Sequence, residues 1–589
     1  MFLGIDVGGT HTDAVVIDGG KVAASCKVPT QHTDLLASVR EAVDILLVQV
    51  SADAIVRVNL STTLSTNAIV EGRTEDVGVV VSAGPGIDPE HARIGRHFRV
   101  IDGSIDHRGE EIAGLDVEAL GAAAEEFAAT GLRVFAAVSK FSTRNPAHER
   151  AMAEALMGAA CCDSDAKVDS DAKVDSDAKA DSDAKADSDA KAASGDFVAM
   201  GHSTSAQLNF PRRVATAYYN AAVWRLYNSF ADAVEVTMKE RGITAPVYML
   251  KADGGTMPLA AARLRPVESI LSGPAASVMG IMALCDIQGT CNEDSLVLDM
   301  GGTTTDMAVF AAGEPVIEPN GMDVGSYATT VRALKTRSIG IGGDSHVHVQ
   351  SGVVRVGPER FGPSMCQGGE VPTLIDALNV CGHAELGDLA ASHRGFEALS
   401  IAHSLEAKAL AKAAIEAAMQ SIATAAQELL DDMNNRPVYT ILELLEGRTM
   451  KPSRIYIMGG PAMVVRNLIM DAMNCRVVVP KEYAIANAIG AALTQTTAEL
   501  ELFADTERGK LFIPTLGQER TVAKRYNLEL AQEDACAALR QYMHDMGAHD
   551  DGSHIDIVEA SSFNMVNDYG LAGRSIRVKC QVRPCIAHF

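Results

Sequence analysis

Two segments in opposite halves of this 589-residue chain have almost the same sequence. Residues 4–13 read GIDVGGTHTD, and residues 297–306 read VLDMGGTTTD. Each segment has an apolar run, an aspartate (Asp6 or Asp299), a Gly-Gly pair, hydroxyl residues and a second aspartate. Copies this far apart are not a local tandem repeat, so the pattern predicts two similar domains that face each other across a cleft.

The Gly-Gly turns have the chemistry of phosphate-binding loops. Glycine allows positive φ and close approach of the backbone to an anion, and successive backbone N–H groups then form a concave anion site. A plain β-hairpin has the same pattern and is compatible with this interpretation. Two copies with matched flanks favour one nucleotide held between the turns. The predicted nucleotide contacts are Gly8, Gly9, Thr10, Thr12, Gly301, Gly302, Thr303 and Thr304.

Asp6 and Asp299 are the candidate catalytic residues. Each ends an apolar run that we expect to be a β-strand, so its carboxylate would lie beside the bound phosphates. A bare carboxylate repels phosphate, which implies a cation between them. Mg²⁺ fits because it prefers one or two carboxylates together with waters and phosphate oxygens. The sequence therefore predicts that Asp6 and Asp299 hold the metal directly or through water, and one of them could instead orient the attacking group.

A third glycine element lies at residues 455–462, IYIMGGPA. A strand that runs into Gly459 and Gly460 would let the backbone pass close to a flat ring, which predicts an adenine contact. A simple turn from strand to helix is an equally good interpretation. The small residues of ANAIGAA, at 486–492, are expected to let a helix pack closely and not to take part in the chemistry.

Composition restricts the class of protein. A chain of this length is expected to form several domains, and its net charge of −25 argues against a nucleic-acid partner. No apolar run is long enough to span a membrane, and the first residues read as a strand instead of a signal peptide. The eleven cysteines are scattered without a CxxC pair, so we expect a reduced, cytoplasmic protein.

Strand and helix patterns alternate along the chain, which predicts an α/β fold. Residues 163–192 are five acidic hexapeptides of the type DSDAKV or DSDAKA, expected to be a disordered insertion and not a calcium site. The final residues, about 502–589, are expected to form a small α+β extension. Helices are predicted at 35–50 (capped by Thr33 or Asp34), 404–432 and 484–501, and strands at 2–5, 14–17, 77–81, 132–138, 247–251, 296–299, 307–310, 455–458 and 477–479.

These residues resemble a known family. The two turns, the Gly-Gly-Pro element and the small-residue helix are similar to the superfamily of sugar kinases, actin and heat-shock chaperones. More specifically, the chain resembles the hydantoinase A/5-oxoprolinase family. The matching segments, in the family's order, are STTLSTNAIVEG (61–72), FSTRNPAHE (141–149), KADGGTM (251–257), SILSGPAASV (269–278), VGPERFGP (356–363) and PTLIDAL (372–378).

The resemblance implies two ribonuclease-H-like domains that close on ATP and Mg²⁺. It assigns residues 1–200 and 201–501 to these parts and 502–589 to the extension. It implies ATP-dependent opening of a cyclic amide such as a hydantoin or 5-oxoproline, with a related branch that carboxylates ketones. No second hydrolase-type region follows residue 589, so a separate hydantoinase B-type subunit and an oligomeric assembly are expected.

The substrate residues are less well defined. Thr62, Thr63, Asn67, Lys251 and Asp253 are candidates because their polar groups could bond an imide ring, although ordinary loop and cap roles are equally compatible. Lys251 is the best single candidate, since a cation would stabilise a developing oxyanion. In addition, His346 and His348 would share one face of a strand, but without a third ligand we expect ordinary histidines.

Three classes of function compete. The favoured reading is an ATP-dependent subunit that phosphorylates the carbonyl oxygen of a lactam for ring opening, or of a ketone for carboxylation. The same nucleotide fold also supports an ATP-driven reactivase or chaperone of a partner enzyme, and a kinase with a stable phosphorylated product. The dependence of ATP turnover on a lactam, on a protein partner or on an accumulating phospho-product would separate them.

Overall fold

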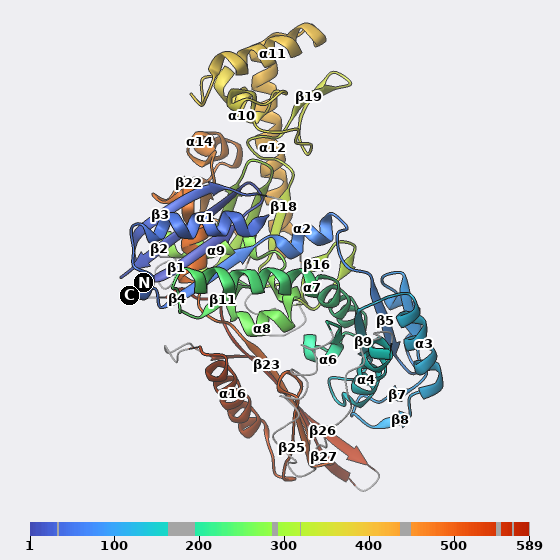
Figure 1. Cartoon of the computed structure of the whole chain (residues 1–589). Coiled ribbons are helices and arrows are strands. Elements are labelled where there is room, and N and C mark those ends of the chain that lie inside the picture. The colour runs from blue at the N-terminus through green and yellow to red at the C-terminus, as the bar shows by residue number, and fades with distance from the viewer. Residues whose placement is uncertain are drawn as a thin grey trace.

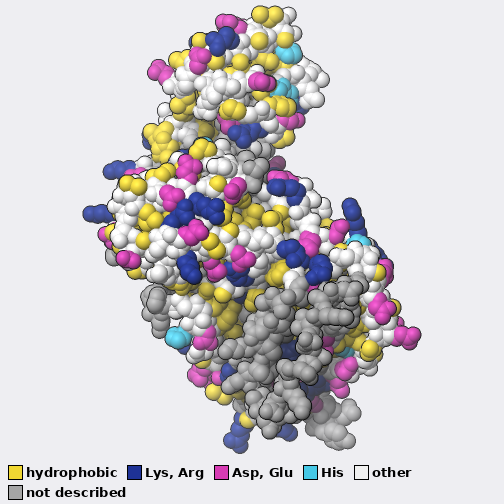
Figure 2. All heavy atoms as spheres, viewed as in Figure 1, with side chains coloured by type: hydrophobic (Ala, Val, Ile, Leu, Met, Phe, Trp, Pro, Cys, Tyr) yellow, Lys and Arg dark blue, Asp and Glu magenta, His cyan; other side chains and the backbone are white. Residues whose placement is uncertain are grey.

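A computed structural model describes residues 1–31, 34–162, 195–285, 293–318, 320–435, 449–548, 555–567 and 570–587. Thr33 and the hexapeptides at 163–192 lie outside these residues. The fold is a mixed α/β architecture, as predicted, with two central sheets flanked by smaller units (Figure 1). Acidic and basic side chains are interspersed over the face shown in Figure 2, without a large basic patch on that face.

The first central sheet has the strand order β12-β11-β4-β1-β2-β3. An antiparallel hairpin, β1–β2, continues into β3, and β4 and β11 run parallel to β1. The buried sides of the strands and of α1 and α7 share one apolar core. The bounds are β1 (Phe2–Val7), β2 (His11–Asp18), β3 (Lys21–Pro29), β4 (Arg57–Thr62), β11 (Val247–Leu250), β12 (Thr256–Pro258), α1 (Leu35–Leu47) and α7 (Phe210–Glu240).

The second central sheet repeats this plan. Its order is β15-β14-β13-β21-β22, with β18 also paired to β14. Again a hairpin, β13–β14, is followed by strands parallel to its first member. The bounds are β13 (Ser295–Met300), β14 (Thr305–Ala311), β15 (Glu314–Pro315), β18 (Thr336–Ile339), β21 (Arg454–Met458), β22 (Arg476–Val478), α12 (Ala407–Asn434) and α14 (Ala462–Met473).

Two helices join the sheets at the centre of the molecule, α9 (Ser272–Leu284) and α15 (Ala486–Leu493). Their side chains share an apolar core with both sheets. A Cβ on Gly490 would lie 2.2 Å from Ala276 O, and one on Gly280 would lie 2.2 Å from Ala486 O. The helices therefore touch backbone to backbone, which confirms that the small residues of 486–492 serve packing.

A four-stranded parallel sheet with the order β10-β9-β5-β6 forms a side unit (Figure 1, right). Helices α10, α11 and the far part of α12 form another unit at the top of the same view. The bounds are β5 (Val77–Ser82), β6 (His97–Val100), β9 (Val134–Ser139), β10 (Phe197–Met200), α3 (Val117–Ala129), α4 (Ala147–Cys162), α10 (Leu374–Val380) and α11 (Leu389–His403).

The C-terminal unit is an antiparallel sheet, β25-β24-β23-β27-β26, with α16 packed against it. The prediction of a helix to about residue 501 is wrong, because α15 ends at Leu493 and β23 begins at Glu499. Between them Thr496 pairs with Thr256 at the edge of the first sheet. The bounds are β23 (Glu499–Asp505), β24 (Lys510–Ile513), β25 (Gln518–Thr521), β26 (Ile555–Asn567), β27 (Gly570–Val582) and α16 (Leu528–Asp545).

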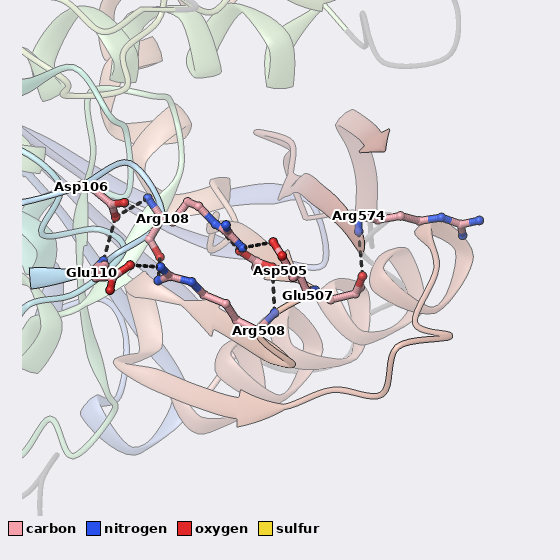
Figure 3. Close-up of polar contacts among 8 residues, drawn as sticks. Asp106, Arg108, Glu110, Asp505, Glu507, Arg508 and Arg574 are labelled. Atoms are coloured by element: carbon pink, nitrogen blue, oxygen red, sulfur yellow. Dashed lines mark hydrogen bonds and ion pairs between the residues drawn. The ribbon is translucent and has the colours of Figure 1, made fainter. Parts of the chain in front are cut away.

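An ion-pair cluster, here called the Arg108 clasp, fastens the C-terminal sheet to the hairpin of β7 (Ser104–Ile105) and β8 (Glu111–Ala113) (Figure 3). Arg108 Nη2 lies 2.6 Å from Asp505 Oδ2 and 2.7 Å from Glu507 Oε2. In the opposite direction, Arg508 of the C-terminal unit forms an ion pair with Glu110 of the β7–β8 hairpin. Because the Asp505 side chain is only 2% exposed, its ion pair is shielded from solvent and holds the two units in register.

The central packing generates a first prediction. Gly490→Ala should lower the midpoint of urea unfolding by the equivalent of about 1–3 kcal/mol, because the new methyl group overlaps the backbone of α9. Gly121→Ala is the matched control. This glycine also lies inside a helix, α3, but no atom lies within 4 Å of its added Cβ, so the variant should be neutral or slightly stabilised. Equal midpoints for both variants would contradict the proposed helix contact.

Candidate nucleotide-binding cleft

The two repeated segments fold into matched hairpins. In the first, Asp6 lies opposite Asp13, and in the second, Asp299 lies opposite Asp306. Each four-residue turn is closed by the same kind of bond, from Gly8 N to His11 O at 3.1 Å and from Gly301 N to Thr304 O at 2.9 Å. The hairpin interpretation is therefore correct, and it is the hairpin that presents the Gly-Gly backbone.

The surroundings of the glycines differ between the two turns. Gly9 has no atom within 4 Å of an added Cβ, so its backbone borders open space. A Cβ on Gly302 would lie 2.6 Å from Asp344 Oδ2, because residues 340–345 pack behind the second turn. Asp344 N donates to Gly302 O at 2.7 Å, and Gly343 N donates to Gly301 O at 2.9 Å. The second turn is thus held by a neighbouring loop.

The threonines divide into two groups. Thr10, Thr303 and Thr304 are partly exposed at the turns, where their hydroxyls could reach a phosphate. Thr12 is fully buried, and its hydroxyl lies 3.1 Å from that of Thr30. The hydroxyl of Thr12 thus has a partner within the protein, and the phosphate contact of this residue stays a prediction. A strand position directly after the turn points this side chain into the protein, where it braces the hairpin.

A single asparagine links the two predicted catalytic aspartates. Asn487, on α15, donates to Asp299 Oδ2 at 3.4 Å, and Ser277, on α9, donates to the same oxygen at 2.6 Å. Burial raises the pKa of Asp6, and Asn487 and Ser61, which lies beside Asp6 in β4, are close enough to lower it. Both central helices thus carry a side chain to this region, and the two carboxylates lie close enough together for the charge of Asp299 to raise the pKa of Asp6 further, after the larger effect of burial.

Burial dominates the electrostatics of these carboxylates. It raises the pKa of Asp6 from 3.8 to about 7, against the lowering effect of the Ser61 hydrogen bond, and the charge on Asp13 raises it further. Burial also raises the pKa of Asp299 and brings that of Asp306 to about 7. The negative charges repel one another at close range, and a cation would relieve this repulsion.

The residues fit a magnesium ion bound together with phosphate. Asp6 Oδ1 is buried and has no hydrogen-bond partner among the described residues, which leaves it available to a cation. In the described part of the chain, no group of three or more His, Cys, Asp or Glu side chains could hold a metal alone. Mg²⁺ does not require one, since waters and phosphate oxygens normally complete its shell.

Groups from both halves meet around the first turn. The pKa of His11 is lowered by burial and by the charge of Lys27, and it also responds to Asp344 and Arg360 from the second half. Lys27 pairs with Asp13 at 2.8 Å, and its Nζ lies 3.4 Å from Ala484 O, next to α15. Charged side chains from both halves therefore lie close enough to the first turn to act on the pKa of His11, which burial lowers most.

The predicted adenine element lies against the second turn. Gly459 has φ +90°, and an added Cβ would lie 2.2 Å from Met300 O and 2.8 Å from Asp299 Oδ1. Gly460 has no atom within 4 Å of an added Cβ. The element is also a turn from β21 into α14, as in the alternative interpretation. It brings a closely packed glycine with positive φ to Asp299, and next to it an open backbone at Gly460.

The predicted substrate residues fall into two groups that the fold separates. Thr63 and Asn67 lie at the start of α2 (Leu64–Val70), beside the first turn. There Thr63 Oγ1 donates to Val7 O at 3.4 Å and accepts from Asn67 Nδ2 at 3.3 Å. Thr62 Oγ1 accepts from Leu64 N at 3.2 Å. These contacts hold the three residues beside the carboxyl end of β1, and among the described residues the side chain of Thr63, the N-cap of α2, makes no capping hydrogen bond.

Lys251 and Asp253 lie elsewhere. Lys251 Nζ is buried, 3.2 Å from Asp253 Oδ2 and 3.1 Å from Thr497 O. Both residues line a cavity that none of residues 4–13 or 297–306 borders. His346 and His348 stack with ring centroids 5.3 Å apart. In the described part of the chain, they belong to no group of three or more possible metal ligands.

Sequence reasoning missed several residues of the cleft. Asn487 was inside a segment that was interpreted only as packing, and Ser277 was inside a family motif without an assigned role. Lys27 gave no signal, because a lysine in an edge strand is common. Arg360 pairs with Asp344 at 3.1 Å, and the unusual aspartate in the glycine-rich loop was the only hint of this contact.

The comparisons with known proteins agree on one family. Residues 2–158 match the family described as the hydantoinase/oxoprolinase N-terminal region, and residues 213–500 match the one described as hydantoinase/oxoprolinase. The caprolactamase subunit alpha of Pseudomonas jessenii is 27% identical over 420 residues, which cover 66% of this chain and 55% of that one. The acetophenone carboxylase gamma subunit of Aromatoleum aromaticum is 24% identical, covering 64% and 53%.

The fold is found in a solved relative. The crystal structure of the ATP-dependent caprolactamase from Pseudomonas jessenii superposes with a TM-score of 0.69 and 20% identity. The match covers 100% of this chain and 87% of that chain. By sequence, this chain spans only about half the length of the two relatives named above.

The raised pKa of Asp6 generates a second prediction, for the protein without nucleotide and in EDTA. As the pH rises from about 4 to about 7, the unfolded chain loses a proton that folded Asp6 keeps, so the free energy of unfolding should fall. Asp6→Asn has no carboxyl group at this position, so its free energy of unfolding should not show the fall that Asp6 causes. At pH 8 the variant should therefore be more stable than wild type, by the order of a few kcal/mol.

Urea unfolding at pH 5 and pH 8 checks this prediction. Asp18→Asn, at an exposed position at the end of β2, is the control and should leave both values unchanged. If Asp6→Asn is destabilised at pH 8 by as much as at pH 5, the carboxylate does not lie in the buried environment described here.

Proposed function

Because the chain belongs to the hydantoinase/oxoprolinase family, we propose that it is an ATP-dependent enzyme that activates a cyclic amide for ring opening. One observation carries the proposal above all others. Two Gly-Gly hairpins have matched registers, and their aspartates, Asp6 and Asp299, lie close together beside Asn487. This arrangement suits one nucleotide bound through both turns, with adenine near Gly460.

We further infer that each half is a ribonuclease-H-like domain. Both central sheets have a hairpin whose first strand is followed by two parallel strands on its other side. The helices that cross between the sheets belong one to each half of the chain. This repeat supports a pair of related ATPase domains that could close on a nucleotide, as the resemblance implied.

In the proposed reaction, the γ-phosphoryl group passes from ATP to the carbonyl oxygen of the amide. An amide resists attack because its nitrogen donates electrons to the carbonyl carbon, whereas the phosphorylated oxygen is a good leaving group. Water then adds to the carbon, and the ring C–N bond breaks with a proton going to nitrogen, which leaves an acyl phosphate. A second water then adds to the acyl carbon, and phosphate leaves. The products are ADP, phosphate and an open-chain amino acid.

The chain's own groups have distinct tasks in this scheme. Backbone N–H groups of Gly8, Gly9, Gly301 and Gly302 would bind the phosphates, and the cleft would exclude water. Asp6 and Asp299 would hold Mg²⁺, which when bound neutralises charge on the transferred phosphoryl group. Asn487 would keep the two carboxylates at a fixed separation, and Thr63 and Asn67 would border the acceptor.

The relatives also suggest partners. Both curated relatives described above are named as subunits, which supports a complex of more than one chain. We propose a hydantoinase B-type subunit as the partner, in a cytoplasmic oligomer. Among the described helices, none is both long and apolar enough to cross a membrane. Carboxylation of a ketone is the second candidate, favoured by the acetophenone carboxylase relative. It differs by requiring bicarbonate.

The test is ADP release with caprolactam, 5-oxoproline, hydantoin or acetophenone, each with and without bicarbonate and the companion subunit. A lactam should stimulate ADP release without bicarbonate. Asp6→Ala and Asp299→Ala should each reduce the stimulated rate by roughly 100-fold or more, because each removes a charged group at the transferred phosphoryl. Asp18→Ala, an exposed control, should not.

Wild-type rates in both aspartate variants would remove the assignment of the cleft. Stimulation by acetophenone only in the presence of bicarbonate would favour the carboxylase instead.

A further inference from the structure

A second site lies outside the cleft, where three units of the chain meet. It is a cavity of about 80 Å³, between α6 (Gly201–Thr204) and β23 in Figure 1. One wall is the carboxyl end of β11 with Lys251, another is the loop that contains Arg332, and a third comes from the C-terminal sheet with Glu499 and Lys579. This volume has room for a few water positions or a small organic molecule.

The C-terminal sheet closes the cavity, so the cavity exists only while that sheet is held in place. The Arg108 clasp supplies this attachment near the far end of β23 (Figure 3). Arg144 adds a second attachment, because its guanidinium lies 3.7 Å from the ring centre of Phe503. The cavity therefore lies at a junction where specific contacts hold separate units of the chain together.

Most charged groups in the cavity wall have close partners. Lys251 lies 3.2 Å from Asp253, and Lys579 lies 3.1 Å from Glu499. The Asp253 carboxylate also accepts from Gly255 N at 2.9 Å and from Thr497 Oγ1. Burial raises the pKa of Asp253, but the charges of Lys251 and Arg332 and the hydrogen bonds from Gly255 and Thr497 together hold it below its ordinary value. The acids of the wall are thus satisfied by other donors.

Arg332 is different. Its Nε lies 3.7 Å from Asp253 Oδ2, and its Nη1 lies 4.0 Å from Glu499 Oε2. Both separations are too long for a hydrogen bond. All three of its guanidinium nitrogens are buried without a hydrogen-bond partner among the described residues. Unpaired buried donors are rare and costly, and a missing ion or ligand is one of the few explanations.

A fixed histidine stands in another part of the wall. Glu149 is fully buried and accepts from Ser139 N at 2.8 Å and from His202 N at 2.8 Å. It also bonds His202 Nδ1 at 2.5 Å. This carboxylate fixes the imidazole, and the other ring nitrogen, Nε2, is the polar atom that remains for a ligand.

We propose that this cavity binds a small organic carboxylate through Arg332. A planar guanidinium fork matches a carboxylate with two parallel hydrogen bonds. The imidazole of His202, in the cavity wall, would then hydrogen-bond an N–H or O–H group of the same molecule. The inference concerns binding alone and does not depend on ATP turnover in the cleft. If the proposed ring opening also holds, either an acidic lactam or the amino-acid product could supply the carboxylate.

Two matched probe pairs test the proposal without nucleotide. 5-Oxoproline and 2-pyrrolidinone share a lactam ring, and only the first carries a carboxylate. Propionate and propionamide differ in the same way without a ring. Saturation-transfer NMR on the full chain should show that both acids bind, and that each neutral partner binds at least about 10-fold more weakly, as expected when charged hydrogen bonds are lost.

The variants locate the site. Arg332→Gln should weaken propionate binding at least about 10-fold and abolish the rise in melting temperature that propionate gives to wild type. Arg332→Lys keeps the charge without the fork, so it should show a smaller, several-fold loss. Arg520→Gln, which changes an exposed arginine of the C-terminal unit, should bind like wild type.

The outcomes separate the possibilities. Equal binding of acids and amides, equal propionate affinity in wild type and in both Arg332 variants, or no binding of either acid at 50 mM would each overturn the proposal. If Arg332→Gln does not fold, the Arg332→Lys result decides. Binding of 5-oxoproline but not of propionate would assign the carboxylate to the lactam. A failure of ADP release would leave this binding result intact, so the two proposals fail separately.

Discussion

The backbone contact between α9 and α15 is the constraint on which the candidate site depends. Because Gly280 and Gly490 have no side chains, the two helices meet closely enough to join both central sheets into one core. Each helix then carries one polar side chain, Ser277 or Asn487, to the buried aspartates. The packing that unites the halves therefore also sets the distance between Asp6 and Asp299, and burial at this junction is what raises the pKa of Asp6 to about 7.

Much of the frame could be predicted from the sequence, because it is specified locally. The repeated Asp-Gly-Gly pattern predicted both hairpins, and apolar runs predicted the central strands. The rest depends on contacts between distant residues. A helical pattern ran past Leu493, yet Thr496 pairs with Thr256 and the chain turns into a strand. The turn pattern predicted a phosphate contact for Thr12 but not its burial against Thr30. Asn487 could not be found from a pattern of small residues, because its role comes from the helix crossing.

Strands of the first sheet end at two different places, the proposed nucleotide cleft and the cavity. β1 and β4 end at the cleft, with Asp6 and Thr63, whereas β11 ends at the cavity with Lys251. Parallel strands bring their carboxyl ends to one edge, where ligands commonly bind in α/β proteins. Residues that seemed from the sequence to form a single substrate pocket are thus divided between two neighbouring sites. The C-terminal sheet, held by the Arg108 clasp, closes only the second.

The central claim is that both hairpins contact one triphosphate. A crystal structure with Mg²⁺ and a non-hydrolysable ATP analogue tests it most directly. The account predicts phosphate oxygens within hydrogen-bond distance of backbone N–H groups in both turns, at residues 8–10 and 301–304, and a metal ion beside Asp6 and Asp299. A triphosphate that contacts only one turn, or that lies away from both aspartates, would contradict it.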